Sequence, residues 1–147
     1  MRRFPWLPIT VPAAVFAIYL LTLRPTVGWI DCGEVTTGAY LLNVLHPTGY
    51  PLYTLIGHIF TLIPIGRVVV RMNVLSALAS AFAAMFCCLT VARLTRSRVA
   101  GIITAALYAF SYTGWSNSVE SSSYPLTALY VALTIYLMVR LKTCLIF

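Results

Sequence analysis

Four stretches of the chain are uncharged and predominantly apolar over about the length that a membrane-crossing helix requires. They occupy residues 4–23, 73–92, 99–119 and 121–139. A helix rises about 1.5 Å per residue, so about 20 residues cover the roughly 30 Å of hydrocarbon in a bilayer. The pattern predicts an all-α integral membrane protein with about four transmembrane helices, at about 5–23, 70–92, 99–114 and 125–140.

The segment between the first two predicted spans is more interrupted. Its apolar second half, residues 51–66, would be only about 24 Å long as a helix. It also contains His58 and, near its end, Pro64. Such a segment is short for a crossing and suits a helix that lies at the membrane interface. We therefore expect an outer loop, 24–69, with interfacial helices at about 33–44 and 51–64.

The positive-inside rule decides whether residues 51–66 cross the membrane. If they cross, four basic residues lie inside and six outside; if they do not, seven lie inside and three outside. In the second case the inside set is Arg2, Arg3, Arg93, Arg96, Arg98, Arg140 and Lys142, and the outside set is Arg24, Arg67 and Arg71. The second topology is favoured. It places all three acids of the chain, Asp31, Glu34 and Glu120, on the non-cytoplasmic face.

Composition agrees with a membrane protein and narrows its partners. Mean hydropathy is +0.91 and only 9% of residues are charged, against about a quarter in globular domains. The net charge of +7 would suggest nucleic acid in a soluble protein. Here the basic residues lie at the ends of apolar segments and form no patch interleaved with aromatic residues, so we expect no nucleic-acid binding. The four cysteines form no disulfide framework and are expected to be free thiols.

Two of the three acids lie in the stretch Gly28-Trp-Ile-Asp-Cys-Gly-Glu34. Asp31 and Glu34 are three residues apart, so they share a face if a helix begins here. Acids at the start of a helix also complement its dipole, and capping is therefore as good an explanation as chemistry. Glu120 follows the third span, and an acid so close to the membrane is energetically costly unless it is exposed to water or has a functional role.

Two further features of the outer segments suggest phosphate binding. The turn His46-Pro-Thr-Gly-Tyr-Pro51 holds His46 and Tyr50 in defined directions, and the imidazole could donate to a phosphate or simply cap the turn. Arg67 and Arg71 lie four residues apart before the second span, where they could reach lipid phosphates or form a specific phosphate clamp. No metal-binding pattern, nucleotide loop or serine nucleophile motif is present, so we expect no metal and no cofactor.

Taken together, five motifs resemble one family of membrane proteins. They are Asp31-Cys-Gly-Glu34, Thr37-Gly-Ala-Tyr40, His46-Pro-Thr-Gly-Tyr-Pro-Leu52, Arg71-Met-Asn-Val-Leu-Ser-Ala77 and Trp115…Glu120. The family is that of domain of unknown function 2723, in the GT-C class of glycosyltransferases, whose eukaryotic members resemble protein O-mannosyltransferases. The resemblance runs from about Val27 to Arg140. Cys32 and Thr48 replace a serine and a proline of the family pattern, and Tyr124 lies two residues later than the aromatic residue that the family places after its glutamate.

The resemblance implies transfer of a mannose-like sugar from a polyprenyl-phosphate donor to a hydroxyl of an acceptor protein or glycan on the non-cytoplasmic face. Asp31 would be the general base, with inversion at the sugar carbon, and Glu34 would support it. Arg71, with Arg67 and His46, would stabilise the leaving phosphate. Glu34 and Glu120 would orient the acceptor or the sugar hydroxyls, and Tyr50 would contribute to binding the substrate or the lipid phosphate. We expect a multi-pass protein of a bacterial inner membrane, in contact with lipid and with other membrane subunits.

The chain is short for this class, and we expect it to hold the amino-terminal half of a GT-C fold, as a fragment that is inactive alone. Two other functions stay open from the sequence. In a small transporter or channel subunit, the three acids would line a path for ions or solutes. In a non-catalytic membrane scaffold, the outer loop would only cap helices.

Overall fold

The computed structural model describes residues 6–29, 31–47 and 49–145, and the regular secondary structure within those ranges is all helical. The sequence-based predictions for Arg2, Arg3, Thr48 and the side chain of Cys144 concern positions outside the described residues. The helices are α1 (Leu7–Leu21), α2 (Cys32–Leu41), α3 (Pro51–Thr61), α4 (Val68–Thr95), α5 (Arg98–Phe110), α6 (Tyr112–Ser118) and α7 (Tyr124–Leu145). The all-α prediction is confirmed.

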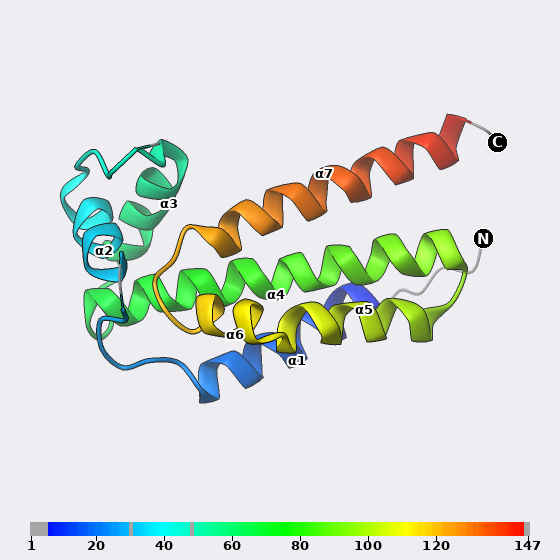
Figure 1. Ribbon diagram of the computed structural model, residues 1–147, viewed down its shortest axis with the longest axis horizontal. Coiled ribbons are helices and arrows are strands. Elements are labelled where there is room, and N and C mark those ends of the chain that lie inside the picture. The colour runs from blue at the N-terminus through cyan, green and yellow to red at the C-terminus, as the bar shows by residue number, and fades with distance from the viewer. Residues whose placement is uncertain (1–5, 30, 48, 146–147) are drawn as a thin grey trace.

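The long helix α4 is the centre of the molecule, and α1, α5 and α7 pack against it (Figure 1). Helices α2 and α3 gather at one end of this bundle, together with the connection from α6 to α7. The turn from α4 to α5 lies at the opposite end. The three acids therefore lie at one end of the bundle and Arg96 and Arg98 at the other, which is the grouping that the charge count predicts.

Among the described residues, two helices are long and apolar enough to cross a membrane: α4, with 28 residues, and α7, over the 19 residues Tyr124–Lys142. The other two predicted spans correspond to shorter apolar helices, α1 with 15 residues and α5 with 13. That all four helices cross the bilayer stays a prediction. The predicted interfacial helices at 33–44 and 51–64 correspond to α2 and α3.

The helix predicted at 99–114 is interrupted at Ser111. The backbone of Ser111 is extended, with φ −63° and ψ 148°, and its side chain accepts a hydrogen bond from the amide of Gly114 at 3.1 Å. A serine in this position caps a new helix, so α5 ends and α6 begins with a change of direction. Helices α5 and α6 together run from the α4–α5 turn toward the end of the bundle that holds the acids (Figure 1).

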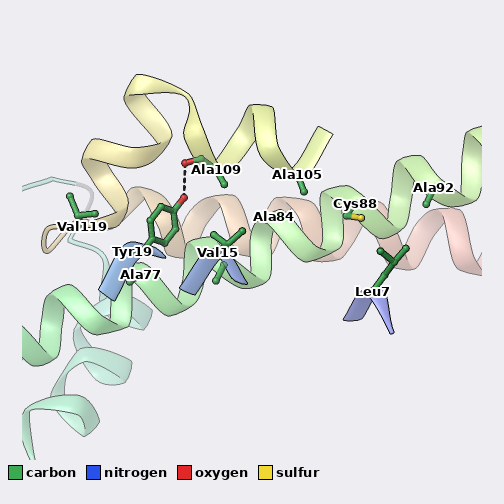
Figure 2. Packing of buried hydrophobic residues seen from close by; sticks show 11 residues of the cluster. Leu7, Val15, Tyr19, Ala77, Ala84, Cys88, Ala92, Ala105, Ala109 and Val119 are labelled. Carbon is green, nitrogen blue, oxygen red and sulfur yellow. Dashed lines mark hydrogen bonds between the residues drawn. The ribbon is translucent and has the colours of Figure 1, made fainter. Parts of the chain in front are cut away.

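The first of two cores lies between α1, α4 and α5 (Figure 2). Small residues of α4, including Ala77, Ala81 and Ala84, are fully buried there and let the neighbouring helices approach closely. Tyr19 is the largest buried side chain. Its hydroxyl donates a 2.8 Å hydrogen bond to the carbonyl of Ala109, at the end of α5, where helical carbonyls lack partners within the helix.

The second core joins α2 and α3 to α4, with Val35, Ala39, Tyr53 and Met72 among its buried residues. Gly57 lies so close to Met72 and Ala39 that an added Cβ would overlap both side chains. His58 adds a hydrogen-bond contact, with Nδ1 2.9 Å from the carbonyl oxygen of Ala39. The two short helices are thus packed against the end of α4, which fixes the residues that they carry.

Replacing Tyr19 by phenylalanine tests the first core. Tyr19→Phe leaves the buried Ala109 carbonyl without its donor, and we expect the free energy of unfolding in detergent to fall by about 1–2 kcal/mol. Tyr112→Phe is the matched control, because that side chain is exposed and its change is expected to have no measurable effect. Equal stability of the two variants would contradict the assigned role of the Tyr19 hydroxyl.

Candidate functional site

A cleft of about 170 Å³ opens at the end of the bundle where the acids gather. One wall comes from the start of α2 and the turn before α3, and the other from α6 and the loop between α6 and α7. The lining residues are Trp29, Asp31, Cys32, Val35, His46, Tyr50, Asn117, Glu120, Ser121, Ser122, Ser123 and Tyr124. Four of the seven predicted site residues, Asp31, His46, Tyr50 and Glu120, therefore line one cleft.

Buried hydrogen bonds hold the α6–α7 loop, residues 119–123, in place. The Ser121 hydroxyl accepts from Thr36 of α2 at 3.1 Å and lies 3.3 Å from the Tyr53 hydroxyl of α3. The Ser122 amide donates to the Ser76 hydroxyl of α4 at 3.1 Å. Burial raises the pKa of Tyr53 to about 12, so its hydroxyl stays neutral at physiological pH. Three helices thus position the loop that carries Glu120.

Asp31 occupies the N-cap position of α2, yet its side chain makes no capping hydrogen bond. The side chain is exposed at the rim of the cleft. A capping role would require its carboxylate to accept from an amide of the first turn. The negative charge of Asp31 can still interact favourably with the dipole of α2, but its carboxylate remains available to a ligand.

Glu34 faces the turn before α3 and forms a pair with His46. Its Oε1 accepts from the backbone amide of His46 at 2.7 Å, and its Oε2 lies 3.0 Å from the imidazole Nδ1. The backbone amide and then the imidazole hold the pKa of Glu34 below its ordinary value. Glu34 lines a second, shallower hollow rather than the cleft itself, so it reaches the cleft through His46.

The turn His46–Tyr50 has the compact form expected of its residues. The Gly49 amide donates to the His46 carbonyl at 2.7 Å, and Gly49 has a φ of +85°, which glycine adopts without strain. The backbone of Tyr50 also lies in the left-handed region, with φ 43°, a conformation that is rare for a bulky residue. Its ring meets the His46 ring edge-on with centroids 5.5 Å apart, so the two side chains support each other at the cleft.

Glu120 forms an ion pair with Arg24, a residue that the sequence indicated only as one of the outer charges. Arg24 Nε lies 3.3 Å from Glu120 Oε2. That oxygen is buried and accepts no hydrogen bond within the described residues, so the guanidinium charge is what compensates it. Gly28 lies directly against the same carboxylate, and an added Cβ would overlap Oε2 and crowd Cys32 Sγ.

Cys32 lies between the two motif acids, but it is buried and free; Cys88 of α4 is also buried and free, and Cys87 of α4 is free and half-buried. Burial raises the pKa of the Cys32 thiol, and the nearby Glu120 carboxylate raises it further. The thiol is therefore protonated at neutral pH and is poorly suited to act as a nucleophile. The free-thiol prediction is confirmed for these three cysteines.

Arg71 and Arg67 are not among the residues of the cleft. Each of the three guanidinium nitrogens of Arg71 donates to a backbone carbonyl, those of Thr61, Ile65 and Gly66. These bonds fasten the end of α3 and the turn that follows it to α4. Arg67 is exposed at the start of α4.

Asp31, Glu34 and His46 each offer a ligand atom within 4.8 Å of the other two, a group that could hold a cation. Both Glu34 oxygens, however, already have partners on His46. The hydrogen-bonded pair accounts for this proximity without an ion. The pairing itself was not evident from the sequence, because the two residues are twelve positions apart and belong to different motifs.

Gly28 and Gly33 provide a pair of opposite tests within one motif. Gly28→Ala places a methyl group against the Glu120 carboxylate, and we expect it to lower the free energy of unfolding by about 1–3 kcal/mol. At Gly33 an added Cβ meets Val27 at an ordinary 3.7 Å. Gly33→Ala should leave stability unchanged or raise it by up to about 1 kcal/mol, since alanine favours a helix. Denaturant unfolding in detergent measures both, and a harmless Gly28→Ala would contradict the close approach.

The pKa of Glu34 can be measured directly, because isotope labelling of the two glutamates gives two NMR carboxyl signals. We expect Glu34 to titrate below its ordinary value and His46→Ala to raise its pKa only part of the way back, because the backbone amide remains. The pair stabilises the fold above the ordinary glutamate pKa, and this contribution is lost as pH falls through the lowered value. His58→Ala is the control; an unchanged Glu34 pKa in His46→Ala would contradict the pairing.

Comparison with known proteins places this site in a family. The chain matches the family described as Protein O-mannosyl-transferase TMEM260 N-terminal domain over residues 31–144. It is 39% identical over 135 residues to Protein O-mannosyl-transferase TMEM260 of Mus musculus, covering 91% of this chain and 19% of that protein. It is 30% identical over 123 residues to Protein O-mannosyl-transferase tmem260 of Dictyostelium discoideum, covering 82% and 15% respectively. No solved structure matches.

These matches confirm the resemblance to protein O-mannosyltransferases and bear on two other expectations. The chain spans less than a fifth of the length of the two curated relatives. Both relatives are eukaryotic, so they give no support to a bacterial origin. The family match begins at Asp31 and includes the cleft residues apart from Trp29. The chain belongs to the family of the Protein O-mannosyl-transferase TMEM260 N-terminal domain.

Proposed function

We propose that this chain forms the acceptor-activating part of a membrane glycosyltransferase. The enzyme transfers a mannose-like sugar from a polyprenyl-phosphate donor to a hydroxyl of an acceptor protein or glycan. The observation that carries the proposal is the cleft, in which Asp31 faces His46, Tyr50 and Glu120 within the family-matched region. The names of the two relatives support O-mannosyl transfer as the reaction.

Asp31 is the general base in this proposal. Its carboxylate takes the proton of the acceptor hydroxyl as that oxygen forms a bond to the sugar carbon. The bond from that carbon to the phosphate oxygen breaks with inversion, and the lipid phosphate leaves with the electron pair. The available carboxylate of Asp31 suits this step, because a base must reach the proton that it abstracts.

His46 stabilises the leaving phosphate, with Glu34 as its support. Glu34 engages Nδ1 of His46, so that the protonated imidazolium ring can donate from its other nitrogen to a phosphate oxygen. The bonds of Arg71 to three carbonyls make it a weaker candidate for this role than His46. Arg67 is exposed at the same end of the bundle and could contact the phosphate of a lipid.

The size of the cleft indicates which part of the substrates this chain holds. Its volume of about 170 Å³ is below the roughly 300–1,000 Å³ of complete small-molecule sites. The cleft therefore suits the acceptor hydroxyl and part of one sugar, and the rest of the donor would be bound elsewhere. The aromatic rings of Tyr50, Trp29 and Tyr124 around the acids are appropriate to a sugar, which has both apolar faces and hydroxyl groups.

The membrane topology of the proposal has α1, α4, α5 and α7 crossing the bilayer, with the cleft on the non-cytoplasmic side and α2 and α3 at the interface. The acids lie at one end of the bundle rather than between its long helices. A transporter or channel would need them along a path through the membrane. Their position therefore favours a site at the surface of the bilayer.

Asp31→Asn tests the assigned base. We expect it to reduce mannose transfer from polyprenyl-phosphate-mannose by at least about 100-fold, because a general base contributes about that much. Donor binding to the same membrane vesicles should be unchanged, since binding does not require proton removal. Tyr40→Phe, at an exposed residue of α2 away from the cleft, is the control for insertion and amount. Full transfer by Asp31→Asn, measured in membranes where the unaltered chain supports transfer, would sink the proposal.

A further inference from the structure

Arg24 contacts the α6–α7 loop twice and α4 once. Its amide donates to the carbonyl of Val119 at 3.1 Å, and its guanidinium pairs with Glu120 at 3.3 Å. Its own carbonyl accepts from Asn73 of α4 at 2.8 Å. Asn73 is fully buried. Arg24 therefore joins the segment that leads from α1 toward Asp31 to the loop on the other side of the cleft.

The ion pair between Arg24 and Glu120 is partly buried, so its loss would affect the packing around Glu120. The Glu120 side chain is 17% exposed and the Arg24 side chain 42% exposed, so the pair is neither a surface pair nor a fully buried one. Glu120 Oε2 has no hydrogen bond among the described atoms, and Gly28 covers it closely. Without the guanidinium, the negative charge of Glu120, which is largely removed from water, would be left uncompensated. An uncompensated carboxylate of this kind either forces its surroundings to open to water or takes up a proton itself.

We propose that Arg24 is a positioning residue that holds the two walls of the cleft together by pairing with Glu120. The pair keeps the segment before Asp31 against the α6–α7 loop, and the base and the opposite wall then face each other. The inference rests on the proposed function only in calling Asp31 the base. The closure of the cleft can be measured without any donor or acceptor.

Cys32 is the reporter for this closure. It is 4% exposed and lies beside Gly28 and near Glu120. In the full chain, with Cys87, Cys88 and Cys144 replaced by alanine, the rate of maleimide labelling of Cys32 in membrane vesicles reports how often the walls separate.

Arg24→Gln should accelerate labelling about tenfold, an effect between those of exposed and buried ion pairs. The direction of the change in labelling rate distinguishes opening of the cleft from a purely electrostatic effect on the thiol. The Arg24 charge favours the Cys32 thiolate, so removing it without opening the cleft would slow labelling rather than accelerate it. Arg24→Lys, which keeps the charge, should restore most of the protection. Arg96→Gln, at an exposed arginine at the other end of the bundle, is the matched control and should leave the rate unchanged.

Coupling between the two residues completes the test. The pH dependence of the rate gives the thiolate fraction of Cys32, which loss of the Glu120 charge raises, so the rates of these variants are compared per thiolate. Adding Glu120→Gln to Arg24→Gln should change the rate per thiolate little further, because residues that act as a pair are not additive. The exchange Arg24→Glu with Glu120→Arg should return the rate per thiolate to within about twofold of the unaltered chain, an outcome that a packing role of the arginine stem would not give. Unchanged labelling in Arg24→Gln, or no recovery in the exchange variant, would overturn the inference. Full mannose transfer by Asp31→Asn would overturn only the proposed function.

Discussion

The buried hydrogen bonds of Ser121 and Ser122 are the constraint on which the candidate site depends. The loop between α6 and α7 enters the interior, where its backbone and hydroxyl groups lose water and must find partners. Thr36, Tyr53 and Ser76 supply those partners from three different helices. Because satisfied buried groups are costly to separate, these bonds hold Ser121 and Ser122 against the three helices, while the Arg24–Glu120 pair adds the contact to the segment before Asp31. The cleft is the space left between this loop and helices α2 and α3.

Much of this arrangement follows from local features of the sequence. The lengths of the apolar stretches predict the helices, because a helix that buries or inserts an apolar surface needs a continuous run of such residues. The charge count places Asp31, Glu34 and Glu120 at one end, since basic residues are distributed by topology rather than by detailed packing. The helices beginning at Cys32 and Pro51 were also expected, although their packing onto α4 was not.

The contacts within the site could not be predicted in the same way, because they join distant segments. Arg24 and Arg71 look alike in sequence as outer cations, yet one pairs with Glu120 and the other donates to three carbonyls. The partner of an arginine depends on which backbone or acid the fold brings within reach. The break at Ser111 was missed for a related reason, since serine is tolerated inside a helix and acts as a cap only where the chain turns.

The three acids differ in what compensates them, and this difference bears on their roles. Glu34 accepts two hydrogen bonds from His46, and Glu120 is paired with Arg24. In the part of the chain that the structure describes, no hydrogen bond or ion pair engages the carboxylate of Asp31. A carboxylate already engaged by protein donors or by a guanidinium is less able to contact a substrate hydroxyl than one without such partners, and a general base must reach the proton that it abstracts. Of the three acids, Asp31 is therefore the one best suited to take a proton from a substrate.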